Sequence, residues 1–308
     1  MIEYNQTYLW EMPMYSNYEA TALIAKFNEK ASENSRKTRK ILAIVIISLS
    51  AVIAAVLVSV DLMEHGDIVI PLMGFVGIVV IALIAFFFLS KIIAKSKLTN
   101  GFLFPEIYRK INDDLSLSLN YDNIKKTDNQ FVYEGSIFPK ACTVYVYRRV
   151  FGNTESLNKF YLFDCSLITG GGQYQQIHHN GIYLFFKIQS DSVLQLRTHG
   201  RPQTKKHKFV KVLAENEFSV FKADNDRPTN FERALIQKAK ELKFRLNAKR
   251  LYLNLSEGVL HFAYQSKNIK RAQIKIDPTT LNEIYQSFTS ELRLVDEFVN
   301  LTEFSGGL

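Results

Sequence analysis

Residues 251–263 read LYLNLSEGVLHFA, and this stretch decides the kind of fold that the chain adopts. Two apolar runs, 251–255 and 259–263, lie on either side of a Ser-Glu-Gly turn at 256–258. Apolar runs joined by a short turn that contains glycine are typical of a β-hairpin. The stretch therefore predicts two neighbouring antiparallel strands.

Further runs rich in β-branched and aromatic residues precede the hairpin at short intervals. They cover 143–147, 160–163, 182–188, 193–196, 209–212 and 218–221. Such residues favour strands, and short strands separated by turns favour an antiparallel sheet. We therefore expect an antiparallel sheet built from these runs and the hairpin.

Helix signals flank the predicted strands. Thr229 with Glu232 three residues later forms a capping box, and Asp277 before Pro278 is typical of a helix start. Ser16 or Asn17 can cap a helix whose apolar residues recur at three- and four-residue spacing. We expect helices over 106–114, 229–242 and 277–300, and an N-terminal helix that runs from 17 through 40 into the residues that follow. The fold class is therefore predicted to be α+β.

Two long apolar runs without any charge lie at 41–60 and 68–89. A helix rises about 1.5 Å per residue, so roughly 20 apolar residues cross the hydrocarbon layer of a membrane. Both runs reach that length. They predict a two-helix transmembrane hairpin, followed by a cytoplasmic antiparallel-sheet domain with flanking helices.

The charges beside the two runs predict their orientation. Residues 36–40 hold four basic residues, and Lys91, Lys95 and Lys97 follow the second run, whereas the connection 61–67 is acidic. Because positive flanks stay in the cytoplasm, both termini are expected there, in a protein of the cell membrane. The predicted parts are a cytoplasmic N-terminal segment with an amphipathic helix (1–40), the transmembrane hairpin (41–97) and the cytoplasmic domain (98–308).

The stretch 170–181 reads GGGQYQQIHHNG and raises the question of a phosphate or metal site. A glycine-rich phosphate loop needs a helix after it, but a predicted strand follows here. Adjacent histidines in a strand point to opposite faces, and no further ligands occur at suitable spacing. We therefore interpret the stretch as a hairpin tip that ends in a turn at Asn180 and Gly181.

A basic segment at 201–211 reads RPQTKKHKFVK and contains no acidic residue. It is the candidate contact for anionic lipid headgroups or a protein partner, since each cation near a membrane surface contributes about 1 kcal/mol. A solvated loop is the alternative interpretation. Nucleic acid is disfavoured as a partner because no recognisable nucleic-acid module surrounds the segment. The candidate residues are Arg201, Lys205, Lys206, Lys208 and Lys211.

No catalytic motif is present in the sequence: a nucleophile elbow, a HExxH pair and a protein-kinase set are all missing. We assign no catalytic, cofactor-binding or metal-ligating residue, and we expect no cofactor. Cys142 and Cys165 are interpreted as small residues in strands. The formal net charge of +8 favours an acidic partner.

An ordered series of short motifs resembles a bacterial membrane family named domain of unknown function 3137. The motifs are FVYEG (131–135), FDCSL (163–167), GIYLFF (181–186), EFSVFKAD (217–224), the helix 231–242 and the hairpin 251–263. The resemblance covers roughly residues 120–302. It implies a two-span protein with a cytoplasmic domain, and it supplies no catalytic residues.

These patterns together predict a membrane-anchored cytoplasmic binding or scaffold module. Its expected partners are the lipid bilayer and either a protein or a membrane complex. A membrane-associated enzyme with an unrecognised site and an accessory subunit of a membrane complex are the alternatives. A deep pocket with converging polar side chains would favour the enzyme, and a flat exposed apolar patch would favour a protein partner.

Overall fold

The computed structural model describes residues 14–64, 84, 98–122, 130–139, 142–153, 159–202, 207–215, 218–223, 226–266 and 276–303. The chain divides into two compact units, which we describe separately. The sheet unit comprises Met1–Pro13, Pro105–Arg271 and Glu283–Leu308, and the helical unit comprises Met14–Phe104 and Ala272–Asn282.

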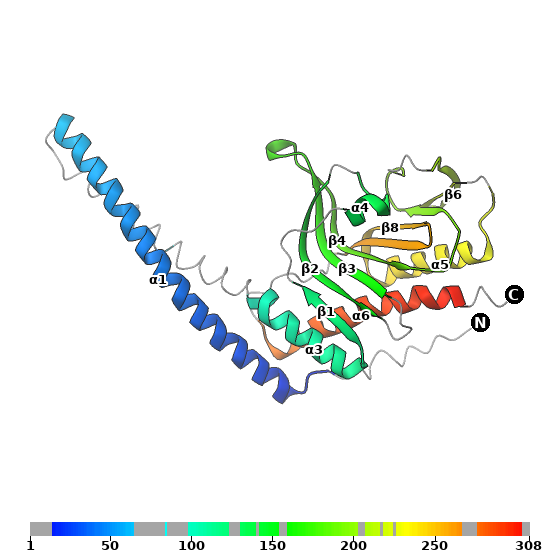
Figure 1. Cartoon of the computed structure of the whole chain (residues 1–308), viewed down its shortest axis with the longest axis horizontal. Helices are drawn as coiled ribbons and strands as arrows, with labels where there is room; N and C mark the ends of the chain where they lie inside the picture. Colours follow the sequence, from blue (N-terminus) through cyan, green and yellow to red (C-terminus); the bar gives the residue numbers. More distant parts are fainter. Residues whose placement is uncertain are drawn as a thin grey trace. The chain divides into compact units, whose positions relative to one another are not determined.

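The sheet unit is built around an antiparallel sheet, which holds nine strands within the described residues (Figure 1). The strand order is β1-β2-β3-β4-β9-β8-β5-β7-β6. The strands are β1 (Ser118–Asp122), β2 (Thr143–Asn153), β3 (Lys159–Thr169), β4 (Gln176–Lys187), β5 (Leu194–Arg197), β6 (Val210–Glu215), β7 (Phe218–Lys222), β8 (Ala248–Ser256) and β9 (Val259–Ser266). This sheet confirms the predicted α+β class and all the strand runs expected from the sequence.

The hairpin of β8 and β9 turns at Glu257 and Gly258. Both residues have positive φ, 53° and 68°, as a two-residue type I′ turn requires. Leu255 pairs with Leu260, and Leu253 pairs with Phe262, so each strand buries an apolar row on the same face of the sheet. The predicted hairpin is therefore confirmed, with its turn where the sequence placed it.

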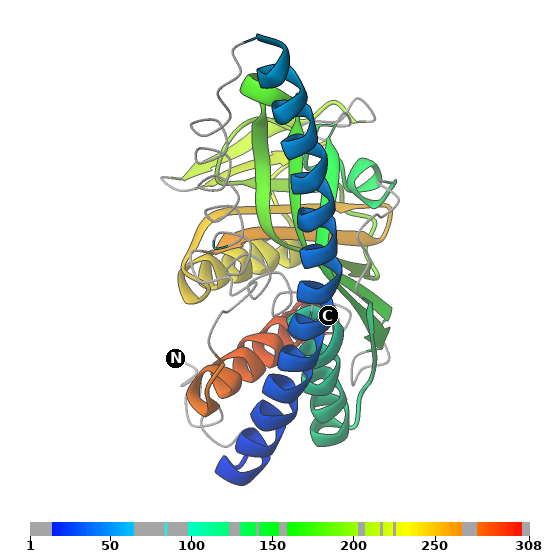
Figure 2. The same ribbon diagram turned by 90° about the vertical axis from the view of Figure 1, so that its left-hand side faces the viewer.

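One face of the sheet is covered by helices. The helices are α3 (Phe104–Leu115), α5 (Asn230–Arg245) and residues 283–303 of α6 (Pro278–Glu303). α5 and this part of α6 run along the same side of the strands (Figure 2). The ring of Phe298 on α6 lies 5.0 Å from that of Phe262 on β9 and 6.3 Å from that of Phe186 on β4. We call this side the helix-covered face.

A buried ion pair joins the helix-covered face to α3 and α6. Arg148 on β2 donates from one nitrogen to Glu291 Oε2 at 2.6 Å and from another to the Tyr108 hydroxyl at 2.6 Å. The Arg148 guanidinium also lies 4.0 Å from the centre of the Phe288 ring. Because a buried charge is costly without partners, this network fixes how both helices sit on β2.

The predicted helix caps at Thr229 and Asp277 are confirmed. Thr229 Oγ1 accepts from the Glu232 N–H at 3.2 Å, and Glu232 Oε2 accepts from the Thr229 N–H at 2.8 Å. Glu232 also forms an ion pair of 2.9 Å with Lys222, which ties the start of α5 to β7. Asp277 Oδ1 accepts from the Thr280 N–H at 2.8 Å at the start of α6.

The opposite face of the sheet is only partly covered, and we call it the open face. The short helix α4 (Gln130–Gly135) packs there, with the Phe131 ring 4.3 Å from that of Phe163. The segment after α4 is held by β5: Gln195 donates to the Ser136 carbonyl at 3.1 Å, and Arg197 donates to the Ile137 carbonyl at 2.9 Å. The sequence did not predict α4.

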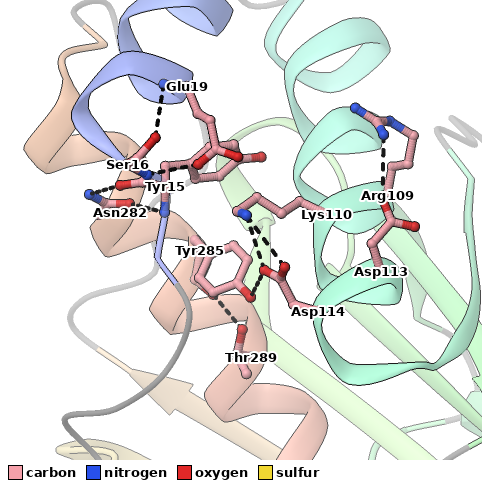
Figure 3. A network of polar contacts seen from close by, with 10 residues as sticks. All are labelled: Tyr15, Ser16, Glu19, Arg109, Lys110, Asp113, Asp114, Asn282, Tyr285 and Thr289. Atoms are coloured by element: carbon pink, nitrogen blue, oxygen red, sulfur yellow. Dashed lines mark hydrogen bonds and ion pairs between the residues drawn. The ribbon is translucent and has the colours of Figure 1, made fainter.

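The helical unit contains α1 (Asn17–Glu64) and the π-helical turn η2 (Thr99–Leu103). Ser16 and Glu19 form a reciprocal cap at the start of α1, with distances of 2.9 and 3.2 Å, which confirms the predicted start (Figure 3). The Tyr15 N–H donates to Asn282 Oδ1 at 3.1 Å. Within the sheet unit, Figure 3 also shows the Tyr285 hydroxyl, which donates to Asp114 at 2.7 Å.

The prediction of a two-span transmembrane hairpin is wrong, and the predicted location in the cell membrane with cytoplasmic termini is wrong with it. Among the helices of the described residues, none has the length and apolar character needed to cross a bilayer. Residues 41–60 belong to α1, the same helix that carries Glu33 and Lys37, so the expected continuation of the N-terminal helix into this run is confirmed. The predicted second span, 68–89, lies outside the described residues except for Ile84.

The predicted turn at Asn180 and Gly181 is also wrong. Both residues lie inside β4, and the chain reverses earlier, between Gly170 (φ 75°) and Gln175. A Cβ atom at Gly181 would lie 2.2 Å from the Tyr264 carbonyl oxygen on β9. Glycine is therefore required there by the close approach of a neighbouring strand, not by a turn.

Candidate functional site

A cavity of about 620 Å³ lies on the open face of the sheet. Its lining comes from β3, β4, β8 and β9, from the end of α4 and from residues 207–209 before β6. Cavities of roughly 300 to 1,000 Å³ are typical of small-molecule sites. The size alone therefore allows a drug-sized ligand.

The floor of the cavity consists of two rows of side chains that cross four strands. Residues directly opposite each other on paired strands share a face, and so do residues two apart along one strand. The inner row is Tyr161, Phe185, His261 and Asn254, in the order β3, β4, β9, β8. The outer row, two residues along each strand, is Lys159, Lys187, Val259 and Ser256.

The cavity exists because α4 covers only part of the open face. Phe131 on α4 lies over Phe163, and Phe138 lies 5.2 Å from the Tyr252 ring, so the row next to the inner row is buried. Glu134 and Ser136, at the end of α4, form one wall of the cavity. His207 and Phe209 line another part of it, before the start of β6.

Three rings of the inner row stack on one another. The Tyr161 and Phe185 rings lie 5.0 Å apart with 17° between their planes, and the Phe185 and His261 rings lie 5.3 Å apart with 24°. Tyr161 and Phe185 are both partly buried. The stacked rings give the floor an aromatic surface that an apolar ligand body can cover.

His261 is a neutral polar group in this floor. Its side chain is 4% exposed, and burial lowers its pKa to about 3. Its Nδ1 lies 3.1 Å from the Tyr183 hydroxyl, so one nitrogen is engaged within the protein. A neutral imidazole offers one donor and one acceptor, which allows His261 to form a hydrogen bond without contributing charge.

Asn254 is the second polar group of the inner row. It is 1% exposed, and within the described part of the chain its Oδ1 has no hydrogen-bond partner. A buried acceptor without a partner costs free energy, and most such groups in folded proteins are paired. Gln195, opposite Asn254 on β5, does have a partner, the Ser136 carbonyl. Asn254 is therefore placed to accept a hydrogen bond from a bound molecule.

Charged side chains lie at the edges of the cavity. Lys159 and Lys187 stand next to each other in the outer row, and both are exposed. Over the described ranges, neither forms an ion pair, although Lys159 Nζ lies 5.6 Å from the centre of the Tyr161 ring. Glu134 and Glu257 line other parts, at the end of α4 and in the β8–β9 turn. The lining thus contains both cationic and anionic groups.

One pair of lining residues has the chemistry of a nucleophile and a base. Ser256 Oγ lies 3.4 Å from His207 Nε2. This distance is longer than the roughly 2.6 to 3.2 Å expected between a nucleophile and its base. Within the described residues, no carboxylate is bonded to the other nitrogen of His207.

The basic segment named from the sequence contributes His207 and Phe209 to the cavity lining, but none of its five candidate residues is part of that lining. Arg201, Lys208 and Lys211 are exposed and are not among the lining residues. Lys205 and Lys206 lie outside the described residues. Contact of these residues with anionic lipid headgroups or a protein partner stays a prediction.

Sequence analysis missed the inner row, although a signal for two of its residues was present. Asn254 interrupts the apolar run LYLNL, and His261 interrupts VLHFA, so each strand carries one polar residue among large apolar ones. A strand buried on both faces normally reads as a continuous apolar run. Such interruptions indicate positions where one face holds a polar site.

The comparisons with known proteins leave the family open. No family model matches the chain, so the resemblance to domain of unknown function 3137 stays a prediction, and no curated protein matches it. Among solved structures, the chain is similar to the crystal structure of the mycobacterial trehalose monomycolate transport factor A, TtfA. The identity is 8% and the TM-score 0.32, over 64% of this chain and 92% of that chain. A TM-score this low does not establish a common fold.

Proposed function

We propose that the chain is a binding module, and that the cavity on the open face holds one small ligand with an apolar body and polar groups. The observation that carries this proposal is the inner row, where stacked rings adjoin the buried and unpartnered Asn254 Oδ1. The rings suit an apolar body, and the amide oxygen suits a ligand donor. Both features lie in one cavity of about 620 Å³.

An enzymatic function has one observation in its favour, the contact between Ser256 and His207. Nucleophilic catalysis also needs a group that orients the base. No such group is bonded to His207 within the described residues, so binding is the better supported function.

The test is an equilibrium titration of the full chain with anilinonaphthalene sulfonate, a fluorescent probe for apolar cavities. Val259 lies in the middle of the outer row, so Val259→Trp places a large ring inside the cavity. The matched control is Val210→Trp, because Val210 is 37% exposed at the start of β6 and does not line the cavity. Circular dichroism confirms that both variants are folded.

We expect saturable binding of one probe per chain. Val259→Trp should weaken it at least about tenfold, equivalent to about 1.4 kcal/mol, and Val210→Trp should leave it unchanged. Equal affinity of the wild type and Val259→Trp would overturn the proposed function, and so would a fluorescence increase that never saturates.

A further inference from the structure

The chemical class of the ligand follows from the groups that line the cavity, and this inference rests on the proposed binding function. We infer that the ligand is an amphipathic monoanion that also carries a hydrogen-bond donor. Its carboxylate, sulfonate or phosphodiester lies between Lys159 and Lys187, and its hydroxyl or amine donates to Asn254 Oδ1. Its apolar body covers the stacked rings of the inner row.

The anionic group is indicated by the two lysines. Phe160 on β3 pairs with Phe186 on β4, so Lys159 and Lys187, one residue further on each strand, stand opposite each other. Like charges directly opposite on neighbouring strands repel and destabilise the sheet. An anion between the two ammonium groups reverses the sign of that interaction and forms charge-assisted hydrogen bonds.

The donor is indicated by Asn254. Its Oδ1 can only accept, and an acceptor that is 1% exposed reaches no bulk water. A ligand in the cavity that brings an O–H or N–H group would supply this acceptor with a partner. His261 beside it is uncharged near pH 7 because burial holds its pKa at about 3, so it does not repel an ammonium donor.

The separation of the two ligand groups follows from the sheet. Lys187 on β4 and Asn254 on β8 are separated by β9, which is two strand spacings. Neighbouring strands lie about 4.8 Å apart, and the inner and outer rows lie about 7 Å apart along a strand, so the two residues are about 12 Å apart across the floor. A fused two-ring body with its polar groups at opposite ends spans this distance once both side chains reach inward.

The two glutamates in the lining restrict the charge of the ligand. Glu134 accepts from Gln130 at 2.7 Å and keeps its place at the end of α4, and Glu257 lies in the exposed β8–β9 turn. A second anionic group on the ligand would meet one of these carboxylates. A monoanion with a neutral or cationic donor avoids that repulsion, whereas a diphosphate does not.

Three fluorescent probes separate the two recognition elements. Hydroxynaphthoate, with its groups at opposite ends, carries both the anion and the donor; naphthoate lacks the donor, and naphthol lacks the anion. Each is titrated into the full chain, into Lys159→Met/Lys187→Met and into Asn254→Leu. Lys249→Met is the matched control, because Lys249 is exposed on β8 and does not line the cavity.

Asn254→Leu keeps the side-chain volume and removes the unpartnered acceptor, so this variant should fold at least as stably as the wild type. We expect hydroxynaphthoate to bind the wild type about tenfold more tightly than either other probe. In the double lysine variant, hydroxynaphthoate should bind no more tightly than naphthol. In Asn254→Leu, hydroxynaphthoate should bind no more tightly than naphthoate. Lys249→Met should behave like the wild type.

The possible failures are distinguishable. Saturable binding of all three probes with equal affinity, blocked by Val259→Trp, would overturn the inferred ligand class and leave the binding function intact. An anion preference that survives in the double lysine variant would also overturn the assignment of Lys159 and Lys187. Absence of saturable binding for these probes and for anilinonaphthalene sulfonate would overturn the binding function itself.

Discussion

Acid should destabilise the sheet unit through His261, and replacing this residue with Gln should remove that part of the effect. Burial lowers the pKa of His261 to about 3, from an ordinary value of 6.5. The unfolded chain keeps the ordinary pKa. Below about pH 6.5 the unfolded state therefore binds a proton that the folded state does not, so the free energy of unfolding decreases as the pH falls from about 6.5 towards 3. Above pH 6.5 this loss is absent.

The magnitude follows from the difference between the two pKa values. One pKa unit corresponds to about 1.4 kcal/mol, so at pH 5 the loss is about 2 kcal/mol, and at pH 3 it is about 4 kcal/mol. Two other titratable groups lie near the imidazole. Burial raises the pKa of Tyr183 well above 10, so its hydroxyl stays neutral throughout this range. Glu134 is present in both proteins, so its contribution cancels in the comparison.

The assay is urea unfolding of the full chain at pH 8 and pH 5, followed by circular dichroism and extrapolated linearly to water. Between pH 8 and pH 5 the free energy of unfolding of the wild type should decrease by about 2 kcal/mol more than that of His261→Gln. His199→Gln is the control, because His199 is exposed, and it should lose as much as the wild type. An equal loss in the wild type and His261→Gln would refute the reasoning, as would an NMR titration of His261 with a midpoint near 6.5.

Two further predictions concern close packing and the buried ion pair. Gly135→Ala should lower the free energy of unfolding by about 1 to 3 kcal/mol, because its Cβ would lie 1.9 Å from the Tyr183 hydroxyl. The control is Gly101→Ala, whose Cβ would have nothing within 4 Å, so this variant should be as stable as the wild type. Equal urea midpoints for the two variants would contradict this prediction. Arg148→Met should lower the free energy of unfolding by about 3 to 5 kcal/mol, because it leaves Glu291 unpaired. Adding Glu291→Leu should restore most of this stability. A double variant as unstable as Arg148→Met would refute this account.

Features encoded within a few residues were predictable from the sequence. The reciprocal bonds of Thr229 and Glu232 need only a three-residue spacing, and the β8–β9 turn needs only a residue such as Gly258 that adopts positive φ. The strand runs were recognisable because β-branched and aromatic side chains suit a half-buried pleated surface. For this reason the α+β class and the position of most elements could be inferred without a structure.

Features that depend on distant neighbours were not predictable. Gly181 looked like part of a turn, but the Tyr264 carbonyl requires it, and Tyr264 lies on a strand far along the chain. α4 is six residues long, and the segment after it is held by Gln195 and Arg197 on β5, a contact that no local pattern reveals.

The candidate site depends on strand order in the same way. The inner row brings Tyr161 together with Asn254, 93 positions later in the sequence, and only the order β3-β4-β9-β8 makes them part of one floor. Polar interruptions at Asn254 and His261 were visible in the sequence. The sequence did not reveal that they lie side by side, because that requires the register of β8 with β9 and of β9 with β4.

The inner row continues beyond the cavity to Gln195 on β5. Polar side chains on this part of the open face have two different roles. Gln195 and Arg197 use their donors to hold the Ser136 and Ile137 carbonyls, so they place the segment that forms the cavity wall. Asn254, between Gln195 and His261, keeps an acceptor that this segment does not reach. A row that served only stability would be satisfied from end to end, since an unpaired buried acceptor costs about 1 to 3 kcal/mol. Asn254 lines the cavity, and its Oδ1 has no partner within the described residues; this coincidence is the physical reason to place the ligand there.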